Sequence, residues 1–177
     1  MNRAEKRRQK KLSEKLDKIT KSTQPPQAAA KSPHSQQNMT VQQAIDLGVQ
    51  HHNSGDLSKA ESIYHQILQA EPNQPVALHY LGVIAHQVGK NDIAVDLIGK
   101  ALSINPNYVN AHINLASVLQ EQGNLDDAVT NFHKALAIMP DYADTHYNLG
   151  NALREQGKLD EAVSSYHKAL AIKPDYA

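Results

Sequence analysis

The sequence repeats itself every 34 residues, and this period restricts the chain to a small set of folds. Four copies follow one another without a gap, at 41–74, 75–108, 109–142 and 143–176. A unit of this size cannot bury its own apolar face, so the copies are expected to stack and share a continuous core. The repeated residues are Pro72, Pro106, Pro140 and Pro174; Gly55, Gly89, Gly123 and Gly157; Ala60, Ala94, Ala128 and Ala162; and Leu47, Leu81, Leu115 and Leu149.

Each copy predicts two antiparallel helices. In the third copy the apolar spacing favours a first helix over about 109–122 and a second over about 126–139. Gly123 stands between them, where a left-handed residue ends a helix, and Pro140 cannot continue the second helix. The sequence therefore predicts an all-α chain of helix pairs.

The starts of several helices carry capping signals. Thr40 is followed three residues later by Gln43, which is the pattern of a capping box. Asn107 and Asp141 follow the closing prolines and are predicted to cap the next helices.

This pattern resembles the tetratricopeptide repeat. The small residue after the first leucine, the glycine at the turn, the alanines of the second helix and the closing proline all stand where that family has them. The resemblance implies a right-handed superhelix, an α-α solenoid of four repeats, in which the first helices line a concave groove. It assigns residues 39–177 to a repeat domain and leaves 1–38 outside it.

Residues 1–38 form a basic arm. They hold ten Lys/Arg and three Asp/Glu, whereas residues 39–177 hold eight and fifteen, which gives +7 and −7. Proline, glutamine and serine dominate 21–38, as in a flexible linker. No aromatic residue is interleaved with the basic ones, so a solvated terminus is favoured over a specific nucleic-acid site. The charged start and the lack of a membrane-spanning apolar run predict a cytoplasmic protein.

The side chains give no catalytic pattern. The absence of cysteine excludes thiolate metal sites and a cysteine nucleophile. The repeated histidines lie on successive helix pairs, roughly 8–10 Å or more apart, which is too far for one metal ion. The sequence therefore predicts no enzyme, no cofactor and no metal site.

A partner-binding groove is the remaining candidate site. In the resembled family, certain positions of the first helices tend to face the groove. Here they are polar and rich in amides, which can pair with both the donor and the acceptor of an extended peptide backbone. The candidate groove residues are His79, Tyr80, Asn110, Asn114, Ser117, Tyr147, Asn148, Asn151 and Arg154.

The third and fourth copies are also similar to repeats of the O-linked N-acetylglucosamine transferases and their bacterial relatives. In those enzymes an asparagine ladder holds substrate peptide, and Asn114 and Asn148 match it. Two functions are therefore open: a non-catalytic scaffold that binds a protein or peptide, or the substrate-recruiting part of a longer glycosyltransferase. The apolar side chains of the last copy, Val163, Tyr166 and Leu170 among them, also predict self-association through the C-terminal repeat.

Overall fold

The computed structural model describes residues 10–11, 14 and 39–175. The arm and linker predicted for 1–38 lie outside these residues, apart from 10–11 and 14. The chain divides into two compact units, one reaching to Tyr80 and the other starting at Leu81.

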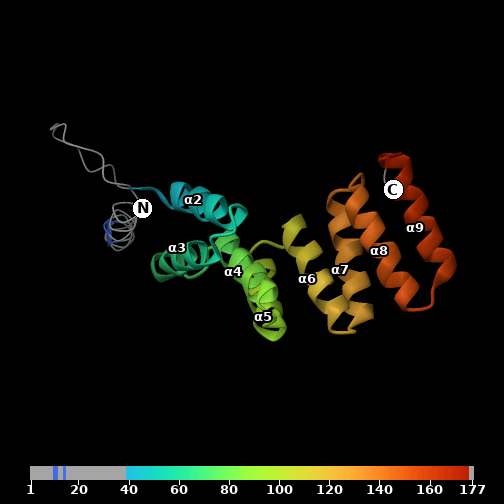
Figure 1. The fold of residues 1–177 in the computed structure, drawn as a ribbon, viewed down its shortest axis with the longest axis horizontal. Coiled ribbons are helices and arrows are strands. Elements are labelled where there is room, and N and C mark those ends of the chain that lie inside the picture. Colours follow the sequence, from blue (N-terminus) through green and yellow to red (C-terminus); the bar gives the residue numbers. More distant parts are fainter. Residues whose placement is uncertain (1–9, 12–13, 15–38, 176–177) are drawn as a thin grey trace. The chain divides into compact units, whose positions relative to one another are not determined.

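Helices account for nearly all of the regular structure in the described part of the chain, and the predicted all-α fold of helix pairs is confirmed (Figure 1). The first helix of each pair begins at Val41, Pro75, Val109 or Ala143. The helices are α2 (Val41–Asn53), α3 (Leu57–Ala70), α4 (Pro75–Gln87), α5 (Asn91–Ile104), α6 (Val109–Glu121), α7 (Leu125–Ile138), α8 (Ala143–Glu155) and α9 (Leu159–Ile172).

The first unit is built on the contact between α2 and α3. A Cβ atom at Gly48 of α2 would lie 2.7 Å from the ring of Tyr64 on α3, so any larger residue would require the ring or the helix to shift. The capping box is confirmed: Thr40 Oγ1 accepts from the amide of Gln43, and the Gln43 side chain accepts from the amide of Thr40.

In the second unit each helix packs on its neighbours in the chain. Contacts join α5 to α6, α6 to α7, α7 to α8 and α8 to α9, and α6 also contacts α8 (Figure 1). Ala94 and Ile98 of α5 share one apolar cluster with Ala111 and Val118 of α6. Phe132 of α7 belongs to a second cluster that also contains α8 residues. The core therefore runs from one pair to the next, as stacking requires.

The turns inside the pairs follow the glycine prediction. Gly123 has a φ of +77°, a left-handed conformation that side chains with a Cβ rarely adopt, and its amide donates to the carbonyl of Gln120. The capping prediction for Asn107 and Asp141 is wrong. Tyr108 and Tyr142 occupy the N-cap positions, and neither side chain caps its helix.

Candidate functional site: a polar groove and an open end face

Polar side chains of α6 and α8 form the groove surface of the second unit. The two helices are in direct contact and carry equivalent residues one repeat apart. Asn114 on α6 and Asn148 on α8 are both half-buried, and Asn110 is exposed at the start of α6. The side chain of Asn148 makes no hydrogen bond to any other described residue. Its amide is thus held near the surface with its donors and acceptor open to a ligand.

Ser117 is less available than the sequence predicts. Its hydroxyl donates to the backbone carbonyl of Ile113, one turn earlier in α6, at 3.1 Å. A hydroxyl that bonds to its own helix has only its lone pairs left for a ligand. Ser117 can therefore accept a hydrogen bond in the groove while it keeps this contact.

Polar contacts between successive first helices repeat in the second unit. Gln120 on α6 donates to the carboxylate of Glu155 on α8 at 2.7 Å. One repeat earlier, His86 Nε2 on α4 lies 3.4 Å from a carboxylate oxygen of Glu121 on α6. His86 and Gln120 stand at the same repeat position, and each contributes a side-chain nitrogen. The carboxylate comes in both cases from the following repeat.

A second set of contacts joins the ends of the first helices to the second helices of the preceding pairs. Gln122 donates to Asp92 at 2.9 Å, and Gln156 donates to Asp126 at 2.7 Å. Sequence reasoning missed both sets, although an alignment of the copies shows the matching residues.

His79 is corrected by the structure. Its side chain is only 3% exposed, and it contacts the ring of Tyr80 edge-on, with 5.1 Å between the ring centroids. So little exposed surface gives a ligand nothing to bind, and His79 is a packing residue. Tyr80 is half-buried and stacks on Tyr64, with 5.4 Å between nearly parallel rings. It lies in the first unit, in an aromatic cluster with His52.

Three predicted groove residues line a different surface. Tyr147, Asn151 and Arg154 project from α8 over a hollow of about 220 Å³, whose other wall is formed by α9. Asn151 is already engaged, because the hydroxyl of Tyr166 donates to its side-chain oxygen at 2.9 Å. The structure therefore places these three residues on the end of the array, beside the apolar face of α9.

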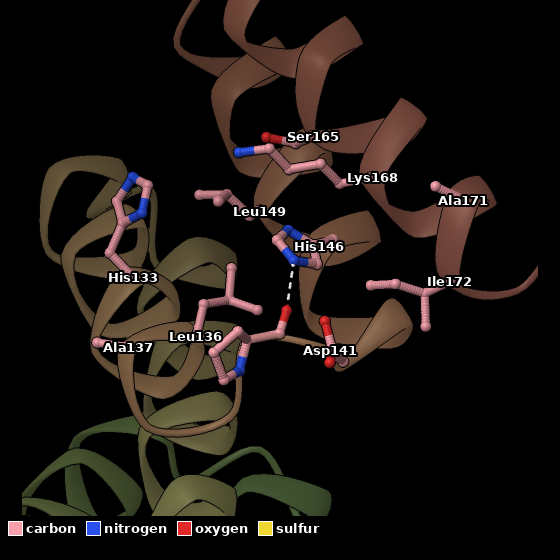
Figure 2. A pocket seen from close by; sticks show the side chains of 11 residues that line it. His133, Leu136, Ala137, Asp141, His146, Leu149, Ser165, Lys168, Ala171 and Ile172 are labelled. Carbon is pink, nitrogen blue, oxygen red and sulfur yellow. Dashed lines mark hydrogen bonds between the residues drawn. The ribbon is translucent and has the colours of Figure 1, made fainter.

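A larger hollow of about 540 Å³ lies between α7, α8 and α9 (Figure 2). His146 projects into it from α8. Its Nε2 donates to the carbonyl of Pro140 at 2.8 Å, while its buried Nδ1 has no partner among the described residues. Ser165 and Lys168 of α9 lie on the side of the His146 ring away from the Pro140 carbonyl (Figure 2).

The preceding repeat shows why this nitrogen is unpaired. The equivalent His112 lies 2.9 Å from Asn131 Oδ1 through its Nδ1, and 3.0 Å from the carbonyl of Pro106 through its Nε2. Ser165 replaces Asn131 in the last copy and is too short to reach the ring. Its hydroxyl donates instead to the carbonyl of Glu161.

The described residues offer no metal centre, since no three of their histidine, aspartate or glutamate side chains come together as ligands. Asp56 is the one described group with a resolved change in acidity. A hydrogen bond from the Lys59 side chain lowers the pKa of Asp56 below its usual 3.8. This exposed carboxylate caps α3 and accepts from the amide of Lys59, so it serves the helix start. No described helix combines the length and apolar character needed to cross a membrane.

Part of the second unit matches a known family in sequence. Residues 107–175 match the family described as tetratricopeptide repeat. None of the curated proteins matches the chain.

Solved structures with the same fold are numerous. A crystal structure of MamA shares 22% identity, covers 98% of this chain and 96% of its own, and superposes with a TM-score of 0.71. MamA 41-end from Desulfovibrio magneticus RS-1 shares 22% identity over 76% of each chain, with a TM-score of 0.68. YrrB, described as a tetratricopeptide repeat protein with an unusual peptide-binding site, shares 21% identity, covers 77% of this chain and 70% of its own, and has a TM-score of 0.67. At these identities the likeness shows a common fold.

Proposed function

We propose that this tetratricopeptide repeat protein is a non-catalytic scaffold that binds an extended segment of another protein along α6 and α8. The observation that carries the proposal is the pair of half-buried amides, Asn114 and Asn148, at equivalent positions of two first helices in contact. An extended peptide that crosses both helices meets an amide at each step, and amides bind backbone groups whatever the peptide's side chains are. Such a site favours a class of extended segments over one sequence.

The chemistry of the groove supports binding without catalysis. Its side chains are amides, a hydroxyl bonded to its own helix, and carboxylates that accept hydrogen bonds from neighbouring side chains. A nucleophile needs an adjacent base, and the groove residues offer no such pair. YrrB has the same fold and is described as having a peptide-binding site, which favours peptide binding for this chain as well. The cytoplasmic location remains a prediction from the sequence.

The test uses a partner recovered with the full chain as bait. Each lost amide hydrogen bond costs about 0.5–1.5 kcal/mol, so Asn114→Ala with Asn148→Ala is expected to weaken binding at least about fivefold. Isothermal titration measures the dissociation constant, and circular dichroism checks the fold.

The matched control removes two amides outside the groove. Asn107 and Asn124 are exposed, and neither side chain caps its helix. Their double alanine variant is expected to bind the partner as the parent chain does. Unchanged binding by the groove variant, or equal loss in both variants, would contradict the proposal.

A further inference from the structure

Helix α9 exposes an apolar face, whereas the equivalent face of α7 is covered by α8. Helices α7 and α9 are both fourteen residues long and differ at only four positions: Asp127/Glu161, Thr130/Ser164, Asn131/Ser165 and Phe132/Tyr166. Val129 of α7 is 9% exposed because α8 packs there, whereas the equivalent Val163 is 52% exposed. Leu136 and Leu170 differ in the same way, at 9% and 43%. The same apolar surface therefore occurs twice, once covered and once open.

The covering helix defines what fits the open face. Leu149, Ala152 and Leu153 of α8 share the apolar cluster of Val129 and Phe132. These α8 residues lie on one stripe, with a small residue beside two leucines, and the small residue allows close approach. A helix that packs on α9 in the same way needs this stripe.

The hydrogen bonds between repeats add a charge requirement. Gln120 and Asp126 of the third copy bind Glu155 and Gln156 of the fourth. The fourth copy holds Arg154 and Asp160 at the equivalent positions, both exposed, and Arg154 makes no ion pair with any described residue. A helix on α9 is therefore complementary when it offers a carboxylate to Arg154 and a donor to Asp160.

Helix α2 does not meet these requirements. At two positions of the first helices, α6 and α8 hold buried residues. These are Ala111 and Val118 in α6, and Thr145 and Ala152 in α8. In α2 the same positions hold Gln43 and Gln50, both exposed, and the Gln43 side chain is used in the capping box. Burial of these amides without partners would cost free energy. A head-to-tail stack of copies through α2 and α9 is thus disfavoured.

From these observations we infer that the α9 end face, formed by α9 with Tyr147, Asn151 and Arg154 of α8, binds an amphipathic helix of a partner protein. That helix resembles α8: it carries leucines and a small residue on one stripe, with an acidic residue followed by an amide at its end. This surface is separate from the groove in the proposed function, and its occupant is helical where the groove takes an extended segment.

The test uses a defined probe, a fluorescent peptide with the sequence of residues 141–158. A lactam between Asp144 and Asn148→Lys holds it helical, since side chains four residues apart share a helix face. Fluorescence anisotropy with the full chain is expected to give saturable binding. Val163→Glu in the chain should weaken binding at least about tenfold, because it places a charge within the apolar contact. Ile93→Glu is the control, since Ile93 is equally exposed, at 51%, on α5.

A charge exchange separates docking from non-specific adhesion. Arg154→Glu in the chain should weaken binding about threefold or more, and Glu155→Arg in the peptide should restore it. The inference is overturned if the peptide does not bind, if Val163→Glu and Ile93→Glu behave alike, or if the charge exchange gives no rescue. It is also overturned if sedimentation shows a stable dimer that Val163→Glu dissociates, because a second copy then occupies the face. None of these results depends on Asn114, so the groove proposal is tested independently.

Discussion

The exchange of Asn131 and Ser165 between the last two repeats tests how a single buried contact sets the stability of this array. His112 and His146 occupy equivalent places and bind equivalent proline carbonyls. Asn131 pairs with the first ring, and Ser165 leaves the second unpaired. Asn131→Ser and Ser165→Asn therefore move the same contact in opposite directions within one molecule.

The size of each effect follows from burial. His112 and Asn131 are 5% and 8% exposed, so Asn131→Ser leaves a buried ring nitrogen without its partner. That costs about 1–3 kcal/mol. Because His146 Nε2 donates to the Pro140 carbonyl, its Nδ1 is the acceptor of the ring. The side-chain NH2 introduced by Ser165→Asn can donate to Nδ1 and should stabilise by about 0.5–1.5 kcal/mol, the usual net value of one hydrogen bond. The hollow beside Ser165 gives the larger side chain room (Figure 2).

The backbone contact at this position is kept in both exchanges. The Asn131 amide donates to the carbonyl of Asp127, and the Ser165 hydroxyl donates to the carbonyl of Glu161, each one turn earlier. The exchange therefore changes the pairing of the ring and little else.

Urea unfolding followed by circular dichroism measures both variants, with Ser165→Ala as the control. Ser165→Ala removes the hydroxyl without adding a partner for the ring, so it should not stabilise. In a thermal melt of the same variants, the midpoint should shift by about 2–4 °C per kcal/mol for a chain of this size. If Ser165→Asn destabilises the chain, or Asn131→Ser leaves it unchanged, pairing of the ring nitrogen does not decide the stability here.

Three further outcomes are expected. Ala128→Leu should lower the unfolding free energy by about 1–3 kcal/mol, and with it the thermal midpoint, because Ala128 is fully buried where helices pack. An unchanged melting curve would contradict the close helix crossing. Asp56→Asn should destabilise at neutral pH, and the difference from the parent should vanish as the pH falls below 3.8 through the lowered pKa of Asp56; a difference that persists in acid would exclude the charge as its cause. The purified chain should not transfer sugar from a nucleotide sugar, and turnover that a point mutation in this chain abolishes would show that it is an enzyme.

The sequence by itself determined the elements of this fold. The 34-residue period, the glycines at the turns and the closing prolines act through local backbone conformation, so they predict the helix ends to within about a residue or two. Gly123 and Pro140 illustrate this, since each acts on its own stretch of chain. The same local reasoning failed for Asn107 and Asp141, because the chain enters the next helix one residue later, at Tyr108 and Tyr142.

Only the tertiary structure decided which side chains remain available. Tyr147, Asn151 and Arg154 follow the same helical spacing as the groove residues, yet they line the end face because no helix of the described chain covers α9. Val129 and Val163 stand in nearly identical helices and differ sixfold in exposure. Burial depends on which helix packs against a surface. A repeated sequence predicts the apolar surface of each helix, but not which helix covers it.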